Sequence, residues 1–113
     1  MNTLHILQKQ LAKFNTDRDW DQFHCPRNLA MSLCVEASEL LECFLWTKDD
    51  DVIPERKYQD LNDEVADILI CLLNFCEKTH IDLEAAFEQK LKKNALKYPV
   101  EKARGSCAKY DEL

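Results

Sequence analysis

The chain has 113 residues, of which 46% are hydrophobic, and it contains one glycine and three prolines. This length predicts a single domain over residues 1–113, and the scarcity of turn residues favours an all-α fold over a turn-rich β protein. The net charge of −6 argues against a general binder of nucleic acids or anionic membranes.

The first predicted helix covers about residues 2–15, where apolar residues recur at helical spacing. The segment NTDRDWDQFHCP then breaks the period. Pro26 suits the first turn of a second helix, which we expect to run to about Trp46. An acidic loop with aspartates at residues 49–51 follows, and these acids either bind a cation or are simply solvated. We favour solvation.

A third helix is predicted over about residues 55–78, beginning after Pro54. Its segment VADILICLLNFC has only Asp67 and Asn74 as polar residues, so we expect this helix to be buried nearly all round. A bundle of this size has little interior for such a helix, and an exposed apolar patch would aggregate. We therefore expect an oligomer.

Asp82 is the predicted N-cap of a fourth helix, which runs to about Tyr98 and is stopped by Pro99. We expect the remaining segment, VEKARGSCAKYDEL, to be irregular. Four helices with short connections predict an all-α, four-helix bundle.

Positive charge gathers between residues 89 and 109, where Glu101 is the only acid. The basic residues there are Lys90, Lys92, Lys93, Lys97, Lys102, Arg104 and Lys109. An acidic body with one basic segment can hold a cation and an anion side by side. The alternative is a solvated helix end whose charges complement the helix dipole.

The six cysteines show neither a C-x-x-C pair nor zinc-like spacing. They are Cys25, Cys34, Cys43, Cys71, Cys76 and Cys107. Most lie in apolar helical runs, where a free cysteine behaves as a small hydrophobe. With no signal-peptide pattern and no apolar run of about 18 residues, the sequence predicts a cytoplasmic protein.

Carboxylates interrupt two predicted apolar helices at three-residue intervals. The second helix contains Glu36 and Glu39, and the third contains Glu64 and Asp67. Residues three apart lie on the same side of a helix, so two packed helices would converge four carboxylates on one point. Such oxygen-only ligation suits Mg²⁺ or Mn²⁺ rather than zinc.

One other interpretation of these acids remains open, in which they pair with lysine or arginine on ordinary helix surfaces. A di-iron bundle is the nearest structural rival, but the chain lacks its pattern. The di-iron bundle needs Glu-x-x-His on two helices, and His5, His24 and His80 fall outside that pattern. A divalent cation would relieve the repulsion and leave open positions, for which a polyphosphate is the natural ligand.

Four segments together carry a resemblance to a known family. They are RDWDQFHCPRNL, EASELLECFLW, DEVADILICL and KLKKNALKYPVEKARGSCAKY. Over about residues 14–110 the chain resembles the MazG-like all-α nucleoside triphosphate pyrophosphatases, most closely the dCTP pyrophosphatases. The resemblance implies hydrolysis of a (deoxy)nucleoside triphosphate to the monophosphate and pyrophosphate for nucleotide-pool house-cleaning. It also implies a tetramer built as a dimer of dimers.

The resemblance assigns the metal site to the residues that match the family's acids. It implies that Mg²⁺, with Mn²⁺ as the alternative, is held by the catalytic residues Glu36, Glu39, Glu64 and Asp67, one of which orients the attacking water. Glu42 also matches the family's acidic run, and we expect it to play a supporting part outside the ligand set.

The resemblance also assigns the phosphate-binding and base-binding residues. Lys90, Asn94 and Tyr98 share one helix face and match positions that contact phosphate, and Lys97 and Arg104 are looser candidates. Lys92 and Lys93 are weaker candidates still. The residues that match base-binding segments are Trp20, His24 and Trp46. An aromatic ring can stack on a pyrimidine while His24 reads its edge.

The loop TKDDDVIPERKY is shorter than the corresponding segment of the animal enzymes, and this departure bears on base preference. Two alternatives to a dCTP pyrophosphatase stay open. One is an enzyme that removes non-standard deoxynucleotides with broad specificity. The other is a helical module that binds a nucleotide or a protein without catalysis.

Overall fold

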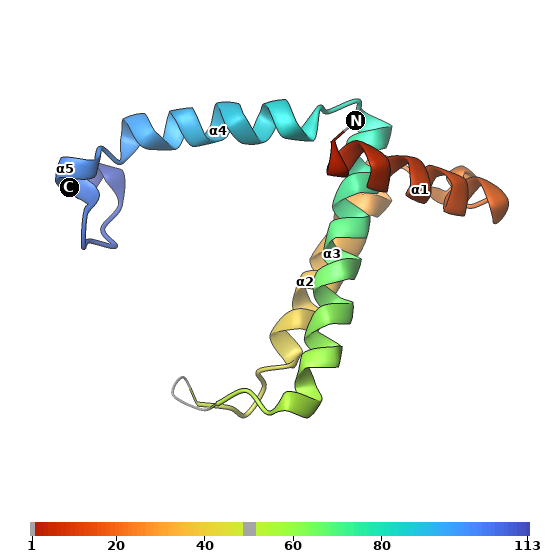
Figure 1. Cartoon of the computed structure of the whole chain (residues 1–113), viewed down its shortest axis with the longest axis horizontal. Coiled ribbons are helices and arrows are strands. Elements are labelled where there is room, and N and C mark those ends of the chain that lie inside the picture. The colour runs from red at the N-terminus through yellow and green to blue at the C-terminus, as the bar shows by residue number, and fades with distance from the viewer. Residues whose placement is uncertain (1, 49–51) are drawn as a thin grey trace. The chain divides into compact units, whose positions relative to one another are not determined.

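The computed structural model describes residues 2–48 and 52–113. Regular structure in these residues is entirely helical (Figure 1), which confirms the all-α prediction. The aspartates at residues 49–51 lie outside the described residues, so neither alternative for them is tested. The chain divides into two compact units, Met1–His80 and Ile81–Leu113, and each is considered by itself.

The first unit is built from three helices. They are α1 (Thr3–Asp17), α2 (Pro26–Glu42) and α3 (Tyr58–Thr79), with 3₁₀ turns at Asp21–Phe23 and Glu55–Lys57. α2 and α3 pack side by side and run in opposite directions (Figure 1). The predicted starts are confirmed, since Pro26 occupies the first turn of α2 and Pro54 directly precedes the 3₁₀ turn that leads into α3.

The second helix ends earlier than predicted, at Glu42 rather than near Trp46. The backbone winds more tightly here than in an α-helix, because the N–H groups of Phe44 and Leu45 donate to carbonyls three residues back rather than four, at 3.0 and 3.1 Å. Trp46 has a φ of 65°, a left-handed conformation that an α-helix cannot continue. Lys57 Nζ donates to the Cys43 carbonyl at 3.2 Å and so satisfies part of the helix end.

The prediction that the third helix is buried nearly all round is wrong for the single chain. Its buried residues are Leu73, Asn74 and Cys76, all near its C-terminal end. Val65 and Ile70, which belong to its apolar stretch, are exposed. The apolar pattern of a helix predicts which of its sides are suited to burial. Whether those sides are buried depends on the elements that pack around the helix.

α1 is attached to α3 by a buried pair of amides. Asn15 Nδ2 donates to Asn74 Oδ1 at 2.9 Å, and both residues are buried. Asn15 also accepts two backbone hydrogen bonds on its carbonyl oxygen, from Arg18 and Trp20 at 3.2 and 3.0 Å. The amide pair therefore joins the end of α1 and the connector that follows it to the middle of the unit.

The second unit contains α4 (Leu83–Lys97) and α5 (Val100–Ala103), with a 3₁₀ turn at Tyr110–Glu112. Asp82 caps α4 as predicted, because its Oδ1 accepts the N–H of Ala85 at 3.1 Å. The predicted irregular tail is wrong in part, since Pro99 starts α5 directly after α4 ends. In the described part of the chain, no helix combines the length and the apolar character that crossing a membrane requires.

Candidate functional site

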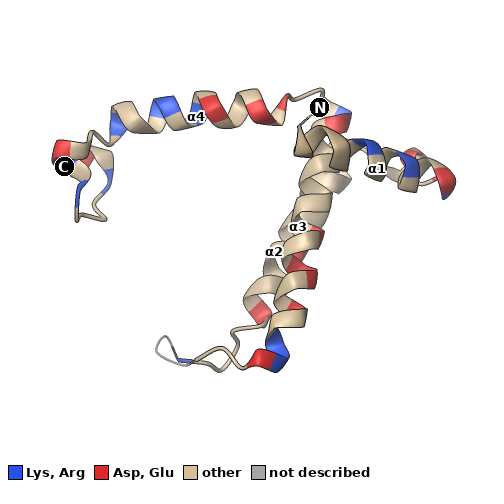
Figure 2. Ribbon diagram, in the orientation of Figure 1, with Lys and Arg blue, Asp and Glu red and all other residues tan. Residues whose placement is uncertain are grey.

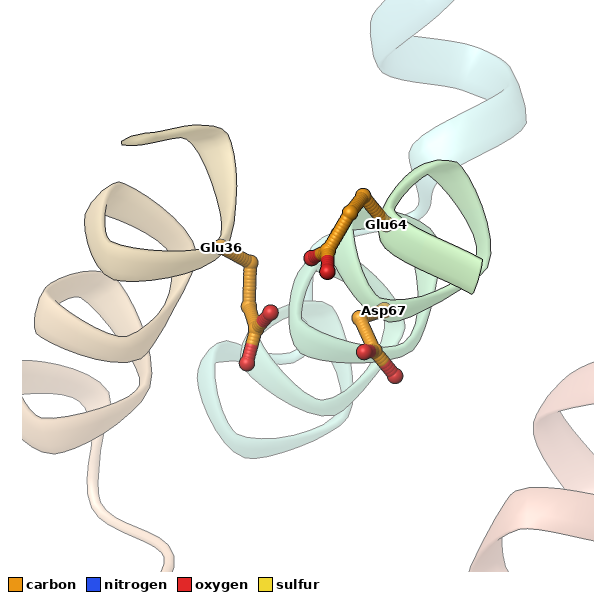
Figure 3. Close-up of side chains that lie close together, drawn as sticks. All are labelled: Glu36, Glu64 and Asp67. Carbon is orange, nitrogen blue, oxygen red and sulfur yellow. The ribbon is translucent and has the colours of Figure 1, made fainter. Parts of the chain in front are cut away.

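Carboxylates of α2 and α3 meet between the two helices (Figure 3). One carboxylate oxygen each from Glu36, Glu64 and Asp67 lies within 4.8 Å of the others. Glu36 comes from α2, whereas Glu64 and Asp67 stand three residues apart on α3 and so face the same way. The two helices therefore contribute their acids from opposite sides, as the three-residue spacing of the acids along each helix predicts.

Glu39 follows Glu36 by three residues on α2, and, after burial, hydrogen bonding to it and its charge raise the pKa of Glu36 and Glu64. The structure thus brings together oxygens of three of the four predicted acids, with Glu39 interacting with two of them, and we call the four acids the carboxylate cluster. Glu42 is exposed at the end of α2. Figure 2 shows the acidic residues of α2 and α3 in the first unit and the lysines of α4 in the second.

Two carboxyl groups of the carboxylate cluster have raised pKa values. Burial, followed by hydrogen bonding to Glu39 and the charges of neighbouring acids, raises the pKa of Glu36. The same causes in the same order raise the pKa of Glu64 to about 7. Each group costs more to ionise here than in water, because it has lost hydration and faces other carboxylates.

Two buried oxygens of the carboxylate cluster favour a bound cation. Oε2 of Glu36 and Oε2 of Glu64 are buried, and neither has a hydrogen-bond partner among the described residues. Buried carboxylate oxygens are normally hydrogen-bonded, paired with a cation or bound to a metal. A divalent cation with oxygen ligands fits this donor set.

Cys71 lies near the carboxylate cluster and was not singled out by its sequence pattern. Burial first, and then the negative charges of Glu36 and Asp67, raise the pKa of its thiol. The thiol of Cys71 is therefore harder to ionise than that of a free cysteine.

A cavity of about 450 Å³ lies between α1, the connector and α3. It is lined by two of the predicted base-binding residues, Trp20 and His24. The rings of Phe14 and Trp20 meet edge to face with their centroids 5.5 Å apart, and the guanidinium of Arg18 lies 3.7 Å from the Phe14 centroid. Trp20 keeps 44% of its surface exposed, so its ring is available to a ligand.

The same cavity has a polar side. Nδ1 of His24 is buried without a hydrogen-bond partner among the described residues. The paired amides of Asn15 and Asn74 also line the cavity. Sequence reasoning did not assign these two asparagines to the site, although a polar Asn74 inside an apolar helix was the signal that could have found them.

Trp46 does not join Trp20 and His24 at this cavity. It is 94% exposed in the single chain. Its left-handed φ places it after the end of α2, where no described element covers its side chain. Its predicted part in base binding stays a prediction.

The predicted phosphate-binding residues lie in the second unit. Lys90, Asn94 and Tyr98 follow one another at four-residue steps along α4 and its C-cap. Lys97 and Tyr98 both contact the ring of Tyr110, which sequence reasoning did not single out. Arg104 caps the end of α5. These residues offer lysine, amide and phenol groups, which are donors suited to phosphate oxygens.

Comparison with known proteins gives concordant matches. The model of the MazG-like family matches residues 31–113. The dCTP pyrophosphatase 1 of Mus musculus is 38% identical over 115 residues, which cover 98% of this chain and 68% of that protein. The dCTP pyrophosphatase 1 of Homo sapiens gives the same identity and coverage.

A solved structure gives the fold. The crystal structure of a pyrophosphatase from Archaeoglobus fulgidus matches with a TM-score of 0.82 and 37% sequence identity. The match covers 88% of this chain and 94% of that one. The chain therefore shares the fold of that pyrophosphatase.

We predict that the metal-free protein loses stability as pH rises from about 5 to about 8. The folded-state pKa of Glu64, about 7, lies above its ordinary value of 4.5. Between these values the folded state holds a proton that the unfolded state has released, so the stabilisation is complete below 4.5 and is lost through about pH 7. Urea unfolding in EDTA at pH 5.5 and 8 measures the difference.

In this experiment Glu64→Gln should reduce the pH dependence, because glutamine does not titrate. Glu77→Gln, which changes an exposed acid of the same helix, should leave it as in the wild type. Added Mg²⁺ should restore stability at pH 8. Stability that rises with pH in EDTA would show that the acids are not held against their mutual repulsion.

Proposed function

Because the chain belongs to the MazG-like family, we propose that it is a metal-dependent pyrophosphohydrolase that cleaves dCTP, or a closely related deoxynucleoside triphosphate, to the monophosphate and pyrophosphate. The relatives named dCTP pyrophosphatase 1 support this reaction and substrate. The observation that carries it is the carboxylate cluster, in which Glu36 and Glu64 each have a buried oxygen without a hydrogen-bond partner among the described residues. Such a cluster is costly unless it binds a cation.

Glu36, Glu39, Glu64 and Asp67 would hold the metal, which we propose to be Mg²⁺, with Mn²⁺ as the alternative. When bound, such an ion polarises a phosphoryl oxygen and lowers the pKa of water. The acids hold their oxygens in place on two packed helices, so little reorganisation is needed. One of the carboxylates also accepts a hydrogen bond from the attacking water and orients it.

The second unit supplies the proposed contacts to the polyphosphate. Lys90, Asn94 and Tyr98 present their donors along one side of α4, and Lys97 and Arg104 add positive charge. Cations held there would neutralise the charge that develops on the leaving pyrophosphate. They bind an oxyanion without taking part in proton transfer.

The cavity beside Trp20 and His24 is the proposed base site. A flat pyrimidine can stack on the exposed part of the Trp20 ring, and the His24 ring offers a nitrogen for its polar edge. The amide groups of Asn15 and Asn74 are already bonded to each other, so they hold the cavity's shape. This division leaves base recognition to Trp20 and His24, with Trp46 as a further proposed contact.

The proposed physiological role is house-cleaning of the nucleotide pool in the cytoplasm. The substrate is made there, and the six free cysteines suit a reducing compartment. A broader activity on non-standard deoxynucleotides is the alternative within the same chemistry. A panel of common dNTPs and NTPs, with monophosphate and pyrophosphate as readouts, separates the two.

We predict that Glu39→Gln and Asp67→Asn nearly abolish turnover, because each removes a ligand charge with little change in volume. Turnover of dCTP at saturating Mg²⁺ is the measurement. Asp60→Asn, which changes an exposed acid in the first turn of α3, is the matched control. If both cluster variants keep near wild-type rates, the metal site is not where we propose.

We predict that Trp20→Ala raises KM by roughly tenfold, because base stacking on an aromatic ring is worth about 1–3 kcal/mol per base. The values of kcat/KM for dCTP, CTP, dTTP and dATP measure both stacking and base reading. If kcat/KM fell equally for all four substrates, Trp20 would stack on the base without distinguishing one base from another. An unchanged KM, with helicity intact by circular dichroism, would remove Trp20 from the site.

We also propose that the active protein is a tetramer built as a dimer of dimers, in which a second copy covers the apolar side of α3. Val65 is 56% exposed in the single chain, and burying such a side chain stabilises an assembly by about 1.5–3 kcal/mol. Sedimentation at micromolar concentration should give four times the 13.3 kDa chain mass.

In the same experiment Val65→Lys should shift the protein toward smaller species. Val100→Lys, at a comparably exposed valine of α5, 62% exposed, should not. A wild-type monomer with full activity would refute the shared interface.

A further inference from the structure

The segment after α4 folds back onto the end of that helix. Gly105 has a φ of 73°, which reverses the chain after α5. The Ser106 N–H donates to the Ala103 carbonyl at 3.0 Å, and the Ala108 N–H donates to Ser106 Oγ at 3.2 Å. These bonds define a turn rather than a loose tail, and they bring the 3₁₀ turn at Tyr110–Glu112 back to α4 (Figure 1).

Tyr110 contacts two consecutive residues of the second unit. Its ring centroid lies 4.9 Å from Lys97 Nζ, which is within the range of a cation–π interaction. Its ring also meets the ring of Tyr98 edge to face, with centroids 6.2 Å apart and an interplanar angle of 83°. One side chain thus holds both the last residue of α4 and its C-cap.

We propose that Tyr110 is a positioning residue for polyphosphate binding, which holds the Lys97 ammonium and the Tyr98 phenol in place before the substrate arrives. This inference rests on the proposed function, in which Lys97 and Tyr98 contact the phosphates. Tyr110 itself stays about half exposed. Its ring therefore contributes more by its two contacts than by filling a core.

An aromatic ring suits this task better than an acid would. A carboxylate beside Lys97 would neutralise the charge that the phosphate needs, whereas a ring attracts the ammonium through its quadrupole and leaves the charge intact. A free lysine side chain also loses rotamer freedom when it binds, which weakens binding. A lysine that is already held loses less on binding.

The test compares Tyr110→Leu, which removes the ring, with Tyr110→Phe, which keeps it. For Tyr110→Leu we expect the KM for dCTP and the inhibition constant of inorganic pyrophosphate to rise roughly three- to tenfold, with kcat within about twofold of wild type. Tyr110→Phe should behave as the wild type. Tyr58→Leu, at a tyrosine of α3 with the same 51% exposure as Tyr110, is the matched control.

A coupling experiment separates positioning from general packing. Lys97→Gln should weaken pyrophosphate binding by a smaller factor in the Tyr110→Leu background than in the wild type, because the ring acts through the lysine. Equal factors in both backgrounds would overturn the proposal. So would wild-type pyrophosphate inhibition in Tyr110→Leu, or a loss in Tyr110→Phe as large as in Tyr110→Leu.

A measurement on the wild type keeps the proposal testable if Tyr110→Leu fails to fold. The ring current of Tyr110 should shift the NMR signals of the Lys97 ε-methylene upfield, and normal shifts would show that the contact is not held. A wild type that neither hydrolyses a triphosphate nor binds pyrophosphate would defeat the proposed function. An active wild type with an unaffected Tyr110→Leu would defeat only this inference.

Discussion

Repulsion between carboxylates is the constraint on which the first unit depends. α2 and α3 bring acids together that would separate if the helices were free, and burial first, then the neighbouring carboxyl groups, raises the pKa of Glu64 there. α2 and α3 pack against each other, and this packing holds their acids together. The helix pair is therefore a scaffold that holds carboxyl groups close together, as preorganised electrostatic sites do. In the proposed function, a bound cation relieves their repulsion.

Local sequence signals predicted much of the helical structure. Pro26 and Asp82 mark helix starts because their chemistry acts within one turn of the backbone. The spacing of Glu64 and Asp67 predicted a shared direction for the same reason. The convergence with α2 needed only the further assumption that the two helices pack, and their apolar character supports that assumption.

Other features depend on groups that are distant in the chain, and periodicity carried no information about them. The bond between Asn15 and Asn74 spans 59 residues. The exposure of Val65 depends on what surrounds α3, and the hydrogen bond from Lys57 to the Cys43 carbonyl at the end of α2 joins residues 14 positions apart. The return of Tyr110 to α4 depends on a turn at Gly105. Each is a property of tertiary structure rather than of one helix.

The buried amide pair has a consequence for the cavity that we propose as the base site. If α1 slipped along α3 by one turn, two amides would be left unpaired in an apolar setting, at a cost of about 1–3 kcal/mol each. A buried polar contact of this kind fixes how two helices align, because apolar surfaces alone allow one helix to slide along the other. The bond between Asn15 and Asn74 thus fixes two residues that line the cavity beside Trp20. If this cavity is the base site as proposed, selectivity for a base can therefore change through the alignment of α1 and α3, without any change in Trp20 and His24.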